Sequence, residues 1–330
     1  MSNLLNSILT PEFFSSILRI SAPILFATLA AVIVEKAGIC NIGLEGIMMI
    51  SALFGSLTAY WTGLWFVGLL VALVCGTVVA LLMGVFAFNL KTNIILVGIA
   101  VNMIGSGGTI FLVKVITKLT EGKAYTSTTE FITSKLQIPT INIPLIEDIP
   151  VVGFVGKVIS GHSLLTYLAF ALVFVVWFML YKTSLGLNLR SVGENPNAAS
   201  SVGVSVQKVR YTAIGLSGLM AGFGGAFMSM TYAMGWSLDM VAGRGFIALA
   251  AQAMGNGEPL GSMFSAMIFG FAQALGIKFS SVGLDSNLAS PIPYLVTIIG
   301  LVIFALGKRR KEAKRHSAAA LHKAAEKAAK

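Results

Sequence analysis

The stretch VIVEKAGICNIGLEGIMMISALFG, residues 32–55, places ionisable and amide side chains between two apolar runs. Glu35, Asn41 and Glu45 are the groups in it that can hold a proton or bond a free backbone group. Three glycines surround Asn41, and glycine disfavours an uninterrupted helix. Irregular backbone at membrane depth is tolerated only where protein or water encloses it. The stretch therefore predicts a broken helix that lines a polar path.

The position of the break allows three interpretations. We predict that a helix restarts near Asn41, with Asn41 as its N-cap and Glu45 in its first turns, where a negative charge is favoured. The alternative is that Glu35 and Lys36 mark the water interface between two spans and that Glu45 only caps the next helix. A proton-relay role for Glu45 is the third, because acids inside a membrane are costly and usually functional.

Three further amide side chains, those of Asn93, Asn102 and Gln252, lie at or within apolar segments and are candidates for the same path. Gly98, Asn102 and Ser106 recur every four residues, so they share one face of a helix. We expect this face to point into the protein or toward a cavity. The alternative is ordinary helix packing, since buried asparagines also bridge helices.

A second group of residues lies in the basic loop 182–210, which contains SLGLNLRSVGENPNAASSVGV. Asn195 followed by Pro196 predicts a helix start, with Asn195 as the N-cap and Pro196 at the first helical position. Gly203 is expected to end this short helix. A capped helix in an otherwise flexible loop predicts a docking site for another protein.

The elements that position these residues follow from composition. The 330 residues are 56% hydrophobic and 11% charged, and the mean hydropathy is +0.87. A soluble domain carries roughly 25% charged residues, so this chain predicts an all-α polytopic integral membrane protein. We expect nine spans, or ten if one of them is broken into two, and some broken or re-entrant segments. Two pseudo-repeated halves are a further hypothesis. The expected spans are 13–35, 39–61, 64–88, 93–117, 163–181, 210–233, 244–256, 260–278 and 291–307.

The charge distribution predicts the orientation of the chain. Of a net charge of +10, most comes from the tail 308–330, which holds nine Lys and Arg against two Glu. A basic block directly after an apolar span is typical of a cytoplasmic C-terminus. Counting spans then places the loop 182–210 inside the cell and the loop 118–162 outside, with Met1 outside as well. Contact of the tail with membrane lipid is expected, and nucleic acid is not.

Residues for catalysis or metal binding do not cluster in the sequence. Cys40 and Cys75 lie in apolar stretches, where we expect small buried side chains. The three histidines, His162, His316 and His322, fall in a loop or in the tail. No phosphate-binding GxxxxGK[ST] motif occurs, so the chain is not expected to bind or hydrolyse ATP.

The loop motif resembles the coupling loop of ABC-importer permeases of the branched-chain amino acid, ribose and nucleoside type. EKAGICNIGLEGIMM is similar to the nucleoside branch, whose members work with a lipoprotein receptor of the basic-membrane-protein type. The resemblance extends from Ala27 to Leu306. The residues that it implicates in ATPase coupling are Arg190, Gly193, Glu194, Asn195, Pro196, Ala198, Ala199 and Gly203.

The resemblance implies a permease domain over residues 1–307, followed by the basic tail. It implies nucleoside import, with cytoplasmic ATPase subunits that bind ATP and Mg²⁺, a second and paralogous permease subunit, and an extracytoplasmic binding lipoprotein. Ribose-like sugars and branched-chain amino acids are alternative substrates. An ion-coupled secondary transporter, using Glu45 or Asp239, and an intramembrane enzyme are the alternatives of other classes.

Overall fold

The computed structural model describes residues 10–128, 137–142 and 153–281, and the positions 295, 298–300 and 302. The chain divides into two units, residues 1–274 and 275–330. In the second unit, the described residues are the end of helix α14 and the five isolated helical positions. Most of the expected span 291–307 and the whole tail 308–330 lie outside the described residues.

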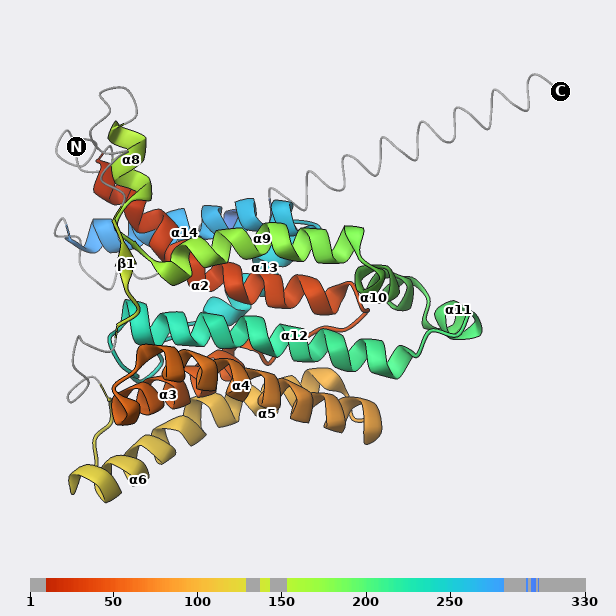
Figure 1. The fold of residues 1–330 in the computed structure, drawn as a ribbon, viewed down its shortest axis with the longest axis horizontal. Coiled ribbons are helices and arrows are strands. Elements are labelled where there is room, and N and C mark those ends of the chain that lie inside the picture. Colours follow the sequence, from red (N-terminus) through yellow and green to blue (C-terminus); the bar gives the residue numbers. More distant parts are fainter. Residues whose placement is uncertain are drawn as a thin grey trace. The chain divides into compact units, whose positions relative to one another are not determined.

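Helices make up most of the described part (Figure 1). Three short π-helical segments, η1, η2 and η4, extend or interrupt them. The elements in chain order are α2 (Pro11–Glu35), α3 (Leu44–Thr62), α4 (Trp65–Gly84), η1 (Val85–Asn89), α5 (Ile94–Met103), η2 (Ile104–Gly108), α6 (Thr109–Glu121), β1 (Thr140–Ile141), α8 (Gly153–Ile159), β2 (His162–Ser163), α9 (Leu164–Lys182), α10 (Ser184–Glu194), α11 (Pro196–Ser201), α12 (Val206–Phe227), η4 (Met228–Tyr232), α13 (Arg244–Met254) and α14 (Pro259–Ser281).

Seven helical segments in the described part are long and apolar enough to cross a membrane. They are Pro11–Glu35, Leu44–Thr62, Trp65–Asn89, Ile94–Thr120, Leu164–Lys182, Val206–Tyr232 and Pro259–Phe279. The prediction of an all-α polytopic membrane protein is therefore confirmed. The expected span 244–256 is a helix, α13, of only 11 residues. At 1.5 Å per residue it covers about 16 Å, roughly half of the apolar thickness of a bilayer.

Helix α2 is the centre of the first unit. It packs against α12, α13 and α9, and almost all of its residues from Ile20 to Val34 are fully enclosed (Figure 1). The helix is apolar on every side, which suits burial in a bundle rather than an amphipathic position at a surface. Its first turn carries Pro11 at a position where no backbone donor is needed, and its last residue is Glu35.

Helices α4 and α12 form a seam with direct backbone contact, the α4–α12 seam. A methyl group on Gly218 would overlap Ala80 and the carbonyl oxygen of Gly76, and one on Gly222 would lie 2.8 Å from the carbonyl oxygen of Ala72. Small residues at this spacing allow helices in membranes to approach closely. The regular spacing of small residues in α12 is thus used for helix packing.

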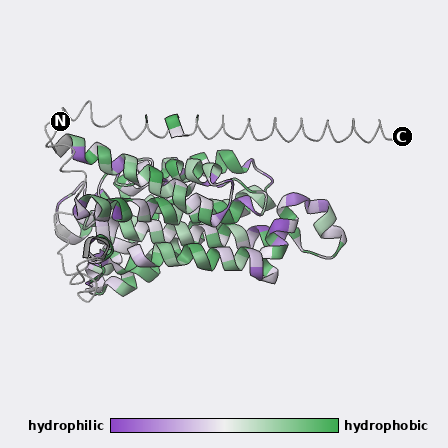
Figure 2. Cartoon of the chain, turned by 90° about the horizontal axis from the view of Figure 1, so that it is seen from above, coloured by the Kyte–Doolittle hydropathy of each residue, from purple (hydrophilic) through white to green (hydrophobic). Residues whose placement is uncertain are grey.

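The bundle has two distinct ends. Helices α10 and α11 lie together at one of them, called here the α10 end, and hydrophilic residues gather around them (Figures 1 and 2). The opposite end holds the described parts of the loop 118–162. These are the end of α6, helix α8 and an antiparallel pair in which Thr140 faces Ser163 and Ile141 faces His162.

Candidate functional site

The first break separates α2 from α3. Gly38 turns the chain with a φ of +70°, and α3 begins at Leu44 with Gly43 as its N-cap. Asn41 is fully buried; its Oδ1 accepts a bond from the Gly43 amide at 3.0 Å, and its Nδ2 donates to Ser217 Oγ of α12 at 3.0 Å. The expected restart of the helix is confirmed. The expected N-cap is wrong, because Asn41 is used two residues earlier to close the turn and to hold α12.

A second asparagine, on α5, completes the bonding of this turn. Asn102 accepts a bond from the Gly46 amide at 2.8 Å and donates one to the Ile42 carbonyl at 2.9 Å. A methyl group on Gly46 would overlap the carbonyl oxygen of Val101, so the two backbones touch here. Asn41 and Asn102 therefore supply the hydrogen bonds that a regular helix would have supplied within itself.

The helix face predicted to point inward does so at Gly98 and Asn102 of α5 but not at Ser106 of η2. Gly98 packs against Gly43, and Asn102 against the turn, whereas Ser106 is exposed. The π-helical segment η2 explains the difference, because its wider turn shifts the residues that follow to another face. The expectation for Ser106 is wrong.

The second break lies between η4 and α13, where residues 233–243 are not helical. Met234, Asp239 and Ala242 have positive φ angles of 53°, 52° and 48°. Residues other than glycine adopt such angles at a cost of about 1–3 kcal/mol each, and they concentrate at functional sites. The segment is held in place by Trp236, which is fully buried; its amide donates to the Thr128 side-chain hydroxyl at 2.6 Å, and its carbonyl accepts from the Thr128 amide at 2.8 Å.

Glu45 joins the two breaks. Its Oε1 accepts a bond from the Gly243 amide at 2.7 Å, and its Oε2 accepts one from the Gly245 amide at 2.6 Å. These amides belong to the N-terminus of α13, where backbone donors are free and the helix dipole favours a negative charge. Glu45 lies in the first turn of α3, as expected, but it caps a different helix. This contact is called the central bridge.

Arg244 provides the positive charge beside the central bridge. It is 8% exposed, and its Nη1 donates to the carbonyl oxygens of Met240 and Val241 at 3.3 and 3.0 Å. Its guanidinium carbon lies 5.4 Å from the centre of the Tyr232 ring. Cation, carboxylate and backbone amides thus compensate one another inside the bundle, and no group of three His, Cys, Asp or Glu residues in the described part is arranged for a metal.

The other expected path residues lie elsewhere. Glu35 and Gln252 form a side-chain hydrogen bond at the α10 end, near the end of α13 that is opposite the central bridge. Asn93 is exposed and caps α5 by accepting a bond from the Ile95 amide at 2.9 Å. The structure therefore gathers Asn41, Glu45 and Asn102 around the start of α3 and leaves the remaining three at the α10 end or at a helix terminus.

The expected docking helix is present. Asn195 Oδ1 accepts bonds from the amides of Asn197 and Ala198 at 3.1 Å each, and Pro196 begins α11. The helix ends at Ser201, followed by Gly203 with a φ of +87°. The local prediction of cap, helix and stop is confirmed.

The eight predicted coupling residues divide between two surfaces. Arg190, Gly193 and Glu194 are on α10, and the others belong to α11, to its N-cap or to the turn after it. Gly193 touches the end of α2, since a methyl group there would overlap the carbonyl oxygen of Lys36. Asn195 and Ala198 are exposed. One face of this unit is therefore packed on α2 and the other is open.

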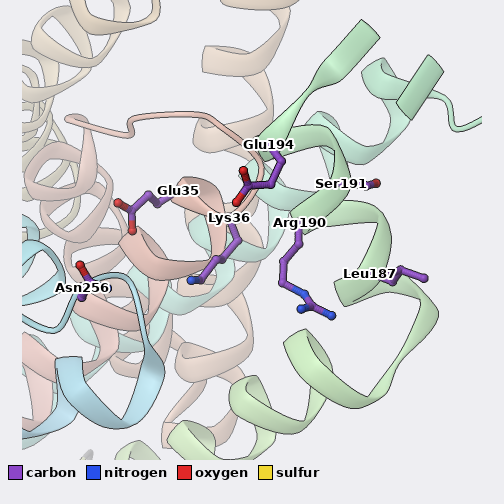
Figure 3. Close-up of a pocket in the computed structure, with 8 residues that line it drawn as sticks. Glu35, Lys36, Leu187, Arg190, Ser191, Glu194 and Asn256 are labelled. Atoms are coloured by element: carbon purple, nitrogen blue, oxygen red, sulfur yellow. The ribbon is translucent and has the colours of Figure 1, made fainter. Parts of the chain in front are cut away.

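A cavity of about 460 Å³ lies between α10 and the end of α2. Figure 3 shows Glu35, the last residue of α2, and Lys36 after it on one side and Arg190 and Glu194 of α10 on the other, with Asn256 of the turn after α13 nearby. The lining is thus polar and carries charges of both signs.

Four side chains near this cavity contact one another in series and are called here the polar ring: Lys36, Glu258, Tyr181 and Arg190. The sequence did not predict these contacts. Lys36 Nζ lies 3.2 Å from Glu258 Oε1, and the Tyr181 hydroxyl donates to Glu258 Oε2 at 2.5 Å. The Arg190 guanidinium carbon lies 4.9 Å from the centre of the Tyr181 ring. Glu258 lies in the Gly- and Pro-flanked stretch GNGEP, which indicates a turn but no contact, and nothing distinguishes Tyr181 within its apolar run.

Cys40 differs from its expected role as a small buried side chain. It is exposed, because it lies in the turn between α2 and α3 rather than inside a helix, and Cys75 is half-buried. Both are free thiols.

Comparison with known proteins gives a consistent result. Residues 13–306 match the family described as the permease component of the branched-chain amino acid transport system. The chain is 36% identical over 295 residues to the guanosine ABC transporter permease protein NupQ of Bacillus subtilis, covering 86% of this chain and 89% of NupQ. It is 34% identical over 310 residues to the nucleoside ABC transporter permease protein NupC of Lactococcus lactis, covering 89% and 92%. A protein of Haloferax volcanii named as a glucose ABC transporter permease, TsgC13, is 32% identical over 269 residues, covering 82% and 78%.

Proposed function

Because this chain belongs to the family of permease components of branched-chain amino acid transport systems, we propose that it forms the membrane passage for nucleosides in an ATP-driven importer. The observation that carries the substrate class is the similarity, at 34–36% identity over most of the chain, to two permeases named for guanosine and nucleosides. The similarity to TsgC13 supports a ribose-like or other sugar as the second candidate.

The proposal places the α10 end in the cytoplasm. The open face of α11 then meets an ATPase subunit, which supplies ATP and Mg²⁺, and the packed face of α10 carries its movement to α2. The loop 118–162 faces the outside, where a binding lipoprotein delivers substrate, and the tail 308–330 is cytoplasmic. A second, paralogous permease subunit completes the passage. The contact of Gly193 with the end of α2 supports this division of α10–α11 into two faces.

The breaks give the passage its means of switching. The two breaks in the helices meet at the start of α3, where Glu45 bonds the amides of Gly243 and Gly245, and transporters commonly form their paths from such discontinuous helices. The half-length helix α13 runs between the central bridge and the α10 end. Its displacement would open one side of the passage and close the other. The six path residues, Glu35, Asn41, Glu45, Asn93, Asn102 and Gln252, remain candidates for lining it.

The test is uptake of radiolabelled guanosine by cells that express this chain with its partner subunits. A parallel strain carries an ATPase whose phosphate-binding lysine is replaced. Uptake that requires the intact ATPase, and that unlabelled nucleosides but not ribose or leucine abolish, supports the proposal. Uptake that persists with the inactive ATPase contradicts ATP coupling, and ATPase-dependent uptake of labelled ribose without uptake of guanosine favours the sugar.

A further inference from the structure

The polar ring connects four separate parts of the chain. Arg190 belongs to α10, Tyr181 to the end of α9, Lys36 to the turn after α2, and Glu258 to the turn between α13 and α14. The backbone of Lys36 also packs on Gly193, so the ring closes back on α10. Any displacement of α10 therefore acts on this set of contacts from two points.

We propose that Glu258 is a positioning residue that links movement of α10 to movement of α13. The inference rests on the proposed function, because it takes α10–α11 as the contact with the ATPase. Glu258 is the one member of the ring that bonds two others directly, through its two carboxylate oxygens. Its loss removes the side-chain contacts that Tyr181 of α9 and Lys36 after α2 make with the turn that ends α13.

The backbone around Glu258 fixes the position of its carboxylate. Asn256 and Gly257 have φ angles of 57° and 67°, which makes a sharp turn, and Pro259 then begins α14. The Glu258 amide donates to the Gly255 carbonyl at 3.1 Å. Because this turn is rigid, a displacement of the Glu258 side chain moves the backbone of the turn with it.

Helix α13 carries that force to the central bridge. Its first residues hold the amides of Gly243 and Gly245 that bond Glu45, and its last turn holds Gln252, which bonds Glu35. The two ends are about 16 Å apart at 1.5 Å per residue for 11 residues. One short helix therefore connects the polar ring to the break in the middle of the bundle.

The ring can rearrange during a transport cycle. The side chains of Lys36 and Glu258 are 20% and 46% exposed, so water can replace either partner and the ion pair is weak. The adjacent cavity of about 460 Å³ leaves space for α10 to move without displacing packed side chains. Weak contacts beside free space suit an element with two arrangements.

The test uses the complete transporter, with its partner permease, ATPase and binding protein, in proteoliposomes with radiolabelled guanosine. Glu258→Gln removes the charge, and Tyr181→Phe removes the hydroxyl but keeps the ring under Arg190. The matched control is Tyr167→Phe on the same helix, whose hydroxyl bonds the Ile159 carbonyl at the opposite end. Measurements are guanosine imported per ATP hydrolysed and the unfolding midpoint of the purified complex.

We expect both ring variants to lower the import per ATP by about two- to fivefold, the factor that corresponds to losing such a contact, with unchanged unfolding midpoints. The control keeps the wild-type ratio, and the double variant Lys36→Glu with Glu258→Lys recovers part of it. An unchanged ratio in Glu258→Gln and Tyr181→Phe overturns the proposal, as does a lower midpoint without a lower ratio, which shows a purely structural contact. A wild-type complex that imports nothing with ATP refutes the proposed function itself.

Discussion

The central bridge and the polar ring lie at the two ends of α13 and use polar groups in opposite ways. In the middle of the bundle, Asn41, Glu45 and Asn102 bond backbone groups, and Asn41 is fully buried. At the α10 end, Lys36 and Glu258 bond side chains and are partly exposed.

The contrast follows from whether water can replace a hydrogen bond that is lost. A buried amide without an acceptor loses about 1–3 kcal/mol because water cannot reach it. A partly exposed side chain exchanges its partner for water at little cost. The middle of the bundle is therefore a framework that keeps its hydrogen bonds when α13 moves, whereas the α10 end is able to change its contacts. Four measurements would break or sharpen this division.

The largest effect is expected for Gly46→Ala. The added methyl group would overlap the carbonyl oxygen of Val101 and lie 2.7 Å from the Asn102 Cα, so α3 and α5 would have to separate at the turn that Asn102 holds. We expect a loss in the free energy of unfolding above about 4 kcal/mol and little folded protein in the membrane, as for other severe overpacking. Gly107→Ala is the matched control, since nothing lies within 4 Å of its added methyl group. Normal amounts of folded Gly46→Ala would show that the framework is not fixed.

Glu45→Ala is expected to have the next largest effect. It leaves the amides of Gly243 and Gly245 without their acceptor, at about 2–4 kcal/mol in total. Thermal unfolding in detergent measures this loss, and Glu45→Gln, which keeps one acceptor oxygen, should retain part of the stability. Uptake per folded molecule then tests the path prediction separately. An unchanged unfolding midpoint in Glu45→Ala would contradict a structural role for the central bridge.

Gly193→Ala should affect activity more than stability. Its methyl group meets the carbonyl oxygen of Lys36, but α10 lies at an end of the bundle and is able to shift outward. The outward shift weakens the contact between α10 and Lys36. A weakening of about 1.4 kcal/mol corresponds to about a tenfold loss of ATP-driven uptake. The amount of protein in the membrane serves as the control. Equal losses of protein and uptake would make the α10 end as rigid as the middle.

The smallest effect concerns pH at the opposite end. His162 is 4% exposed, and its Nε2 lies 2.8 Å from the Val158 carbonyl. Burial lowers the pKa of this imidazole from 6.5, the Val158 contact partly opposes it, and Arg19 lowers the pKa further. The unfolded chain then binds more protons, so the stability from neutral His162 is complete above pH 6.5 and declines as the pH falls below it.

The check is the unfolding midpoint between pH 7.5 and pH 5, values that bracket about 6.5, the ordinary pKa of histidine. His162→Asn should flatten the decline at the acidic side. A wild-type protein that is equally stable throughout would show that His162 does not titrate differently in the folded state.

Local signals in the sequence predicted local structure well. Asn195, Pro196 and Gly203 each have one position in a helix that suits them, so α11 follows from the chain alone. Long apolar runs likewise gave the spans to within a few residues. The basic composition of the tail says nothing about its structure, and the span 291–307 stays a prediction.

Contacts between distant segments were not predictable in the same way. Glu45 was recognised as unusual, but its partners are almost 200 residues away in the chain. An expected N-cap at Asn41 failed because α12 offers it Ser217 instead. The change of helix face at Ser106 results from the wide π-helical turn of η2, which the spacing of residues in the sequence does not reveal. The sequence thus identifies which residues are costly to bury, and only the packing determines what they bond.

Close contact along the α4–α12 seam limits how this protein can be redesigned. Gly76, Gly218 and Gly222 leave no space for a single additional carbon atom. A directed-evolution library aimed at a new cargo would lose most of its members if it varied these positions. Diversity placed instead on an exposed position of the irregular segment 233–243, such as Leu238, would keep both this seam and the central bridge.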